Sequence, residues 1–324
     1  MIQLFYFRLP KVAGFFKKSI FLFLCAFPFL FAGNTFAQGK KLKTIIIDPG
    51  HGGKDYGARG EYEGTLGSFE KNITLAISLK LVDEIKKQMP DVKVIPTRTT
   101  DIFMDVHEKA KFANDHNGDL FISIHADAVT LKTGSRIVGY KDHHYNTTKY
   151  VGKGKSRKKV VTKHTKKVPV KEYYKIPTTR KGTSTLLLVA RQSSDKVKAL
   201  QNSDMYITDA EDSTATVNYE SPEWKASAML YSQKYFRRSY QLANNVQEEI
   251  AKTGRNNLGV WQREKGLWVL HATQMPAILI ETGFIANYDD ERYLNSEKGQ
   301  QEIAQAITKA IMKYRDVIEG TAGK

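Results

Sequence analysis

Four side chains in this sequence combine residue types and positions that suit hydrolytic metal chemistry. His51 lies in Ile-Ile-Asp-Pro-Gly-His-Gly-Gly, and His125 lies in Phe-Ile-Ser-Ile-His-Ala-Asp, so each histidine closely follows an apolar run. Glu70 opens an expected helix, and Glu281 follows another apolar run in Ala-Ile-Leu-Ile-Glu-Thr-Gly-Phe. Two imidazoles and one carboxylate are the ligand set of a catalytic zinc ion that keeps its fourth position open. With the fourth residue as general base, the pattern predicts a zinc hydrolase.

Each of these residues also has an ordinary structural explanation when it is taken alone. His51 can cap a glycine-rich turn, and His125 can be a buried histidine beside an apolar strand. Glu70 suits the first turn of a helix, where the helix dipole favours a negative charge. Their joint placement argues against these explanations, because the C-terminal ends of parallel strands share one edge of a sheet. We therefore expect one zinc ion bound by these three residues, with Glu281 beside it.

Other metal or nucleophile motifs in the sequence are incomplete. The segment His107–Lys111 begins like a helical zincin signature but has a lysine where the second histidine belongs. His143, His144 and His164 lie among lysines that oppose a cation. No serine occupies a Gly-x-Ser-x-Gly turn.

Apolar runs and amphipathic segments alternate along the chain. The expected strands are Lys43–Asp48, Val92–Pro96, Leu120–Ile124, Thr183–Ala190, Leu267–Leu270 and Ala277–Ile280. The expected helices are Phe69–Gln88 with Ser68 as N-cap, Met104–Asn114, Pro222–Thr253 and Gly299–Tyr314. Continuous apolar strands are typical of parallel sheets that are buried on both faces. The pattern predicts a single α/β domain with a mixed, mostly parallel sheet and helices on both faces.

The first 37 residues are expected to be a signal peptide. Basic residues precede the apolar run Ile20–Ala32, which is too short to span a bilayer comfortably, and Thr35-Phe36-Ala37 supplies a small-x-small cleavage pattern. The catalytic domain is then expected over residues 38–324, and an uncleaved N-terminal anchor is the alternative. The single cysteine, Cys25, lies in the leader, so the mature chain has no disulfide or thiolate site. These features predict an exported protein that is periplasmic or associated with the cell envelope.

The formal net charge of +16 comes mainly from one stretch of the chain. Residues 131–182 hold sixteen lysines and arginines, two acidic residues and five tyrosines, and they interrupt the expected catalytic domain. This basic insertion is either a solvated, partly disordered loop or an electrostatic arm near the cleft. An arm of this kind could bind anionic glycan, envelope phosphates or a regulatory partner. Because the protein is expected to be exported, no nucleic-acid partner is expected.

Four stretches of the sequence resemble a known enzyme family. Ile-Asp-Pro-Gly-His-Gly-Gly, Phe-Glu-Lys-Asn, Phe-Ile-Ser-Ile-His-Ala-Asp and Ile-Glu-Thr-Gly-Phe-Ile-Ala-Asn resemble the zinc-dependent N-acetylmuramoyl-L-alanine amidases (amidase type 3) of bacterial cell walls. The resemblance covers residues 43–130 and 182–315 in the same order and leaves the basic insertion outside. It implies that His51, Glu70 and His125 bind the zinc ion and that Glu281 is the catalytic base. Lys109 stands where the family has an arginine.

The resemblance also implies a substrate and a reaction. The bond would be the amide between the lactyl group of N-acetylmuramic acid and the L-alanine of the stem peptide in peptidoglycan. The reaction would serve wall remodelling or daughter-cell separation. Two alternatives stay open, namely a zinc peptidase that cuts within the stem peptide and a non-catalytic peptidoglycan-binding protein of the same fold.

Two further expectations concern the surroundings of the site. Asp48 and Asp127 lie near the two histidine motifs, and either can orient an imidazole or simply stabilise a turn. Some members of the family carry a helix that blocks the zinc until a partner removes it, which implies an envelope activator protein. The acidic segment Asp209–Glu223 likewise lies between the second histidine and the late strands, so Glu211 or Glu220 is a candidate for the open zinc position. The alternative is that this segment is an ordinary surface loop.

Overall fold

The computed structural model describes residues 41–127, 129–188, 221–263 and 266–321. The expected signal peptide and the candidate zinc-blocking residues Glu211 and Glu220 lie outside these ranges. Among the helices within them, none is long and apolar enough to cross a membrane.

In this part of the chain, a six-stranded sheet forms the centre of the domain, in the order β2-β1-β3-β8-β6-β7. Its strands are β1 (Thr44–Pro49), β2 (Lys93–Pro96), β3 (Leu120–Asp127), β6 (Thr183–Leu188), β7 (Asn257–Arg263) and β8 (Ala277–Phe284). Neighbouring strands run parallel except β6 and β8, which are antiparallel. The sheet is therefore mixed and mostly parallel, as the sequence predicts.

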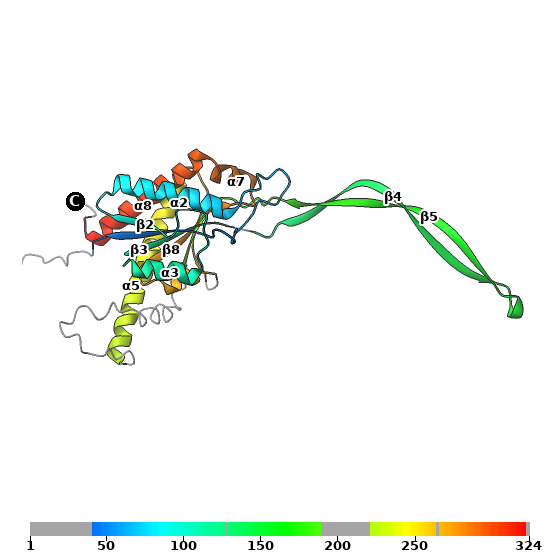
Figure 1. Ribbon diagram of the computed structural model, residues 1–324, viewed down its shortest axis with the longest axis horizontal. Coiled ribbons are helices and arrows are strands. Elements are labelled where there is room, and N and C mark those ends of the chain that lie inside the picture. The colour runs from blue at the N-terminus through cyan, green and yellow to red at the C-terminus, as the bar shows by residue number, and fades with distance from the viewer. Residues whose placement is uncertain (1–40, 128, 189–220, 264–265, 322–324) are drawn as a thin grey trace, which may run out of the picture.

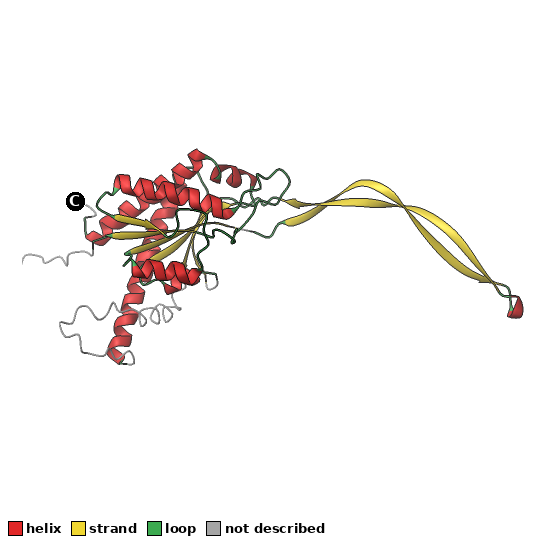
Figure 2. Cartoon of the chain, viewed as in Figure 1, coloured by secondary structure: helices red, strands yellow, loops and turns green. Residues whose placement is uncertain are grey.

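Helices cover both faces of this sheet (Figures 1 and 2). One face packs against α2 (Glu70–Gln88), α5 (Pro222–Ala251) and α8 (Glu297–Glu319), and the other against α3 (Val106–Asp115) and α6 (Trp268–Ala272). The short helix α7 (Tyr288–Leu294) follows β8. The predicted single-domain α/β class is confirmed.

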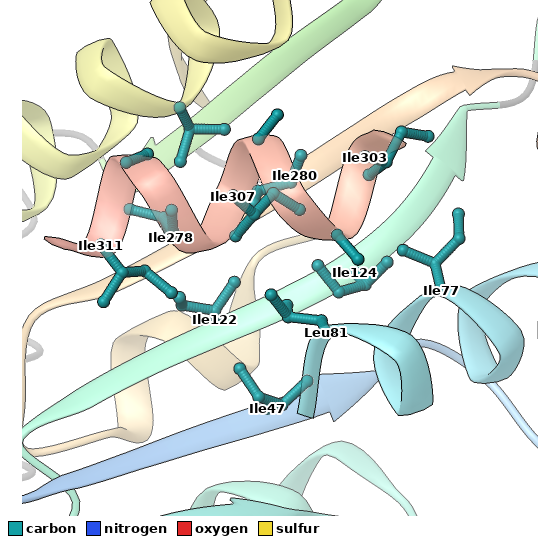
Figure 3. Close-up of a cluster of buried hydrophobic side chains, with 14 of the residues drawn as sticks. Ile47, Ile77, Leu81, Ile122, Ile124, Ile278, Ile280, Ile303, Ile307 and Ile311 are labelled. Atoms are coloured by element: carbon teal, nitrogen blue, oxygen red, sulfur yellow. The ribbon is translucent and has the colours of Figure 1, made fainter. Parts of the chain in front are cut away.

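The two cores explain why the strands are apolar at successive positions. Ile45 and Ile47 of β1 belong to the core beneath α2 and α8, whereas Ile46 between them belongs to the core beneath α3 and α6. Side chains alternate between the faces of a strand, so a sheet covered on both sides needs apolar residues at every position. Figure 3 shows the first core, where Ile307 and Ile311 of α8 lie over the isoleucines of β3 and β8.

Three local predictions are wrong or incomplete. The predicted strand Leu267–Leu270 is instead the start of helix α6, and its apolar residues pack on the second core as one face of a short helix. A run of four apolar residues has no periodicity that separates strand from helix. Ser68 is not the N-cap of α2, because Phe69 holds that position and the Ser68 hydroxyl donates to Glu291 instead. Strand β7 was not predicted, and Gly259 interrupts its pattern of apolar residues.

The basic insertion forms a long antiparallel hairpin, β4 (Lys132–Val151) with β5 (Lys158–Ile176), closed through the short 3-10 turn η1 (Gly154–Ser156). It extends far from the body of the domain as a twisted ribbon of two strands (Figure 2). No residue of either strand is buried. These residues thus form regular strands rather than a loop, although they are exposed to solvent as the first alternative expects, and the role of an electrostatic arm stays a prediction.

Candidate metal centre

His51, Glu70 and His125 come together at the edge of the sheet where β1 and β3 end. His51 follows β1 in a turn, Glu70 is the first residue of α2, and His125 lies near the end of β3. One nitrogen or oxygen from each residue lies within 4.8 Å of those of the other two. This separation is close to what bonds of about 2 Å to a single ion require. The structure thus brings these three residues together as a group that can hold a metal ion, and their role as zinc ligands stays a prediction.

Glu70 links the two imidazole rings and is held as a carboxylate. Its Oε1 lies 2.9 Å from Nδ1 of His125, and its Oε2 lies 3.1 Å from Nε2 of His51. The backbone N–H groups of Ala58 and Ala126 donate to the same two oxygens. Burial alone would raise the pKa of Glu70, but its hydrogen bonds and charge interactions with the imidazoles of His125 and His51 hold the pKa far below its usual range. The group therefore presents the ionised oxygen that a metal ligand needs.

His51 is positioned by a carboxylate that the motifs of the sequence do not predict. Asp55 Oδ2 lies 2.8 Å from Nδ1 of His51. Burial lowers the pKa of His51, but the carboxylates of Glu70 and Asp55 outweigh it and raise the pKa above its ordinary value. A carboxylate at Nδ1 fixes the ring so that Nε2 points toward Glu70, where a shared ion would bind. The signal in the sequence is an acidic residue four positions after the histidine, within the same glycine-rich turn.

Buried cations hold the backbone that carries His51. Lys109 Nζ lies 2.9 Å from Asp48 Oδ1 and donates to the carbonyl of Pro49, while Arg98 donates to the carbonyls of Pro49 and Gly50. Asp48 also accepts from the hydroxyls of Thr97 and Ser123. Asp48 thus takes the alternative structural role rather than orienting an imidazole. His51 itself has φ 59°, an unfavourable conformation for a residue with a Cβ, which surrounding contacts must maintain.

Two glycines leave room for the ligand side chains. A Cβ atom on Gly50 would lie 2.6 Å from Cε1 of His125. A Cβ atom on Gly57, where φ is +65°, would lie 2.6 Å from both Glu70 Oε2 and His51 Cδ2. Side chains at these positions would occupy the space that the three ligands need, so the turn is shaped around the group.

Glu281 lies beside this group, paired with His125 in the ladder between β3 and β8. Its side chain is buried, and within the described part of the chain its Oε2 atom has no hydrogen-bond partner. Burial raises the pKa of Glu281 to about 7, and the negative charges of Asp127 and Glu70 add to this effect. A bound cation would supply the charge partner that this carboxylate lacks. The donor set, the reserved space and the unpartnered oxygen all fit a metal ion.

The comparisons with known proteins point to one enzyme family. The family model of N-acetylmuramoyl-L-alanine amidases matches residues 45–313. N-acetylmuramoyl-L-alanine amidase AmiC of Escherichia coli O6:H1 is 29% identical over 84% of this chain and 52% of its own length. AmiA of Escherichia coli K12 is 25% identical over 84% of this chain and 76% of its own. The chain thus spans only about half the length of some curated relatives that it matches, AmiC among them.

Solved structures share the fold. An N-acetylmuramoyl-L-alanine amidase from Clostridium difficile 630 superposes with a TM-score of 0.52 and 23% identity, covering 86% of this chain and 98% of its own. The CwlD amidase from Clostridioides difficile, solved in complex with the GerS lipoprotein, gives a TM-score of 0.51 and 23% identity, covering 85% and 99%. Because the family model spans most of the sequence and the expected ligands meet at one sheet edge, this chain belongs to the N-acetylmuramoyl-L-alanine amidase family.

Proposed function

We propose that this protein uses one zinc ion to hydrolyse the amide bond between N-acetylmuramic acid and the L-alanine of peptidoglycan stem peptides. The proposal rests on the meeting of an ionised Glu70 with the imidazoles of His51 and His125. Next to them lies the buried Glu281, one oxygen of which has no hydrogen-bond partner among the described residues. Two imidazole nitrogens and one carboxylate oxygen suit zinc with an open position. Membership of the amidase family supports the same substrate and bond.

Each residue then has a definite task. His51, Glu70 and His125 hold the ion, and Asp55 keeps the ring of His51 in the orientation that exposes Nε2. When bound, zinc supplies Lewis-acid chemistry for attack on a carbonyl carbon. Glu281 accepts the proton of the attacking water and passes it to the nitrogen of the leaving L-alanine. A pKa near 7 lets Glu281 both accept this proton and release it again. A cation bound nearby would lower that pKa.

The setting of the reaction is part of the proposal. We infer that the protein is exported and acts in the periplasm or cell envelope during wall remodelling or daughter-cell separation. We propose an envelope protein as a further partner that activates the enzyme, and the CwlD amidase solved in complex with the GerS lipoprotein supports a partner of this class. Autoinhibition by the segment that contains Glu211 and Glu220 stays a prediction.

The decisive experiment compares wild type, Glu281→Gln and His125→Ala on purified peptidoglycan. We expect Glu281→Gln to bind about one zinc ion per chain by elemental analysis yet to lose at least about 10²-fold in activity, in line with loss of a general base. His125→Ala should lose the metal as well as the activity. Mass spectrometry of the products separates the alternatives, because only the amidase releases intact stem peptides from sugar chains. Cleavage within stem peptides would favour the peptidase, and binding without turnover would favour the non-catalytic protein.

A further inference from the structure

The hairpin β4–β5 is the most strongly charged part of the described structure. Residues 132–176 contain fourteen lysines and arginines and only two acidic residues, Asp142 and Glu172. Glu172 is already paired, because its Oε2 lies 2.8 Å from Nε of Arg136. The ribbon therefore presents a dense and largely uncompensated positive charge to solvent.

A ribbon of this shape gains little stability from its own contacts. Both strands consist of exposed or half-exposed residues, and within the described residues no third strand pairs with either edge. An isolated two-stranded hairpin is marginally stable at best in water, and like charges along it repel one another. Binding to a polyanion would relieve this repulsion, so the charge pattern calls for an anionic partner.

The cations lie on both faces of the ribbon. The register pairs Lys149 with Val160 and Tyr150 with Lys159, and side chains alternate along each strand. Lys149 and Lys158 therefore lie on one face, and Lys159 and Lys163 lie on the other. A flat membrane surface would contact one face only, whereas a linear anionic polymer can follow both. The tip at 152–157 carries Lys153, Lys155 and Arg157 and no apolar side chain that could enter a bilayer.

Aromatic rings lie among these cations. On one face the ring of Tyr145 stacks on those of His143 and His164, at centroid distances of 6.2 Å and 5.1 Å. The ammonium of Lys166 lies 5.4 Å from the centroid of the Tyr145 ring. Aromatic surfaces beside cations suit a polymer that carries both apolar sugar faces and carboxylates.

The hairpin begins beside the candidate metal centre. β4 follows β3, which carries His125, after a short connection, and the guanidinium of Arg136 ties the base of the ribbon to Glu63 at 3.0 Å. Strands of about 20 residues at 3.3 Å per residue extend roughly 60 Å from the domain. A polymer bound along the ribbon would therefore be held close to the site at one end.

We propose that the β4–β5 hairpin binds peptidoglycan through the carboxylates of its stem peptides and tethers the candidate metal centre to the wall. This inference rests on the proposed function for the choice of peptidoglycan as the polyanion. Many weak charge pairs along one ribbon give multivalent binding, which keeps the site near the polymer between turnovers. The binding is expected to weaken with salt, because exposed charges are screened beyond about 10 Å at 0.1 M ionic strength.

Two variants test the tether without touching the metal centre. The first changes Lys149, Lys158, Lys159 and Lys163 to Gln and keeps the hairpin length. Its matched control changes Lys43, Lys86, Lys87 and Lys93 to Gln, four exposed lysines at the opposite end of the sheet. The second variant replaces residues 138–170 by Asn-Gly. It joins the directly paired Ile137 and Lys171 through a two-residue turn and retains the contacts of Arg136.

Cosedimentation with peptidoglycan sacculi measures the binding, with Glu281→Gln added to every protein so that the wall stays intact. We expect both hairpin variants to lose about tenfold in affinity at low salt, and the control to stay within about twofold. Amidation of the carboxylates of the sacculi with glycinamide should weaken binding of the protein with the unaltered hairpin. The affinity should fall as far as it does when the hairpin variants bind native sacculi. Equal binding by the hairpin variants and the control overturns the inference. Tighter hairpin-dependent binding to phosphatidylglycerol vesicles or duplex DNA than to sacculi also overturns it.

A separate assay keeps this inference distinct from the proposed function. With Glu281 restored, hydrolysis of a short, soluble N-acetylmuramoyl peptide should be the same in wild type and in both hairpin variants, while release from sacculi falls. Failure of wild type to cleave the soluble fragment would refute the proposed function and leave the binding result intact. A loss of soluble-fragment hydrolysis in the hairpin variants would contradict the tether, because it would assign the ribbon to the site itself.

Discussion

At the scale of single residues, the site combines two opposite electrostatic environments. Glu70 is held ionised by the imidazoles of His51 and His125, whereas Glu281, which pairs with His125 across the β3–β8 ladder, is buried with an unpartnered oxygen among the described residues. Pairs of carboxyl groups whose environments push their pKa values apart are typical of acid–base sites. The first then serves as ligand and the second as proton acceptor, under the proposed function.

The raised pKa of Glu281 predicts a pH-dependent stability of the metal-free protein. The group has an ordinary pKa of 4.5 and a folded pKa of about 7, so the folded state binds the extra proton between these values. Relative to Glu281→Gln, the free energy of unfolding of wild type should therefore fall by roughly 3 kcal/mol as pH rises through this window. Urea unfolding in the presence of a chelator measures it, with the exposed Glu61→Gln as control. Parallel curves for wild type and Glu281→Gln would contradict the burial argument.

The buried pair of Lys109 and Asp48 predicts a non-additive effect on stability. Burial would raise the pKa of Asp48, but Lys109 and the hydroxyls of Thr97 and Ser123 hold it below its usual range. Removing one partner leaves the other charge buried and unpaired, so Lys109→Met should cost about 3–5 kcal/mol. Lys109→Met combined with Asp48→Asn should cost clearly less than the sum of the two single changes. A double-mutant cycle by denaturant unfolding tests this, and additive costs would exclude direct coupling.

At the scale of elements, the residues at the ends of strands were the most predictable part of the site. His51, His125 and Glu281 each follow or end an apolar run, and parallel strands bring such positions to one edge regardless of the loops between them. Asp55 was missed because its contact with His51 depends on the path of a turn rather than on periodicity. Helix α6 was mistaken for a strand because a run of four apolar residues fits either element.

The glycine-rich segment before α2 predicts that a side chain at Gly57 weakens zinc binding, an effect that can be separated from backbone strain. Gly57 and Gly67 have nearly the same φ, +65° and +68°, but a Cβ on Gly57 would clash with Glu70 and His51, while a Cβ on Gly67 would meet nothing within 4 Å. Both alanine variants should lose about 1 kcal/mol of stability from the left-handed conformation. Only Gly57→Ala should also weaken zinc binding, by about tenfold or more, since it displaces two ligands.

Calorimetric titration with zinc, together with thermal unfolding, separates the two effects. Gly67→Ala serves as the matched control for Gly57→Ala. If both variants bind zinc as wild type does, the turn is not shaped around the ligands. If both lose zinc equally, the loss comes from the backbone rather than from the crowded site.

At the scale of the whole molecule, the chain combines a body with buried apolar cores and a hairpin whose strands are exposed. The α/β body is held by two apolar cores on either side of one sheet, whereas the hairpin buries no residue of its strands. The sequence revealed the boundaries of the basic insertion through its charge but not its shape. In β5, Lys158 and Lys166 lie on one face and Lys159 and Lys163 on the other, so the alternation of polar and apolar residues that marks a strand is absent there.

This division predicts that the body folds without the ribbon. Replacement of residues 138–170 by Asn-Gly removes no buried residue of either strand, so the free energy of unfolding should stay within about 0.5 kcal/mol of wild type. The urea m-value should also hardly change, because it scales with the surface that unfolding exposes. Ile307→Ala, which removes a fully buried side chain of α8, should cost about 2–5 kcal/mol in the same assay.

Limited digestion with trypsin provides a second test of whether the α/β body is folded independently of the hairpin. The lysines and arginines of residues 132–176 lie on an exposed ribbon whose opening disrupts neither apolar core, so cleavage should occur there first and leave a folded body. Peptidoglycan fragments should slow this cleavage in wild type if they occupy the ribbon. The opposite result would be early cleavage within the α/β body or a large loss of stability in the shortened variant. Either outcome would show that the hairpin supports the fold and that the body is not an independent folding unit.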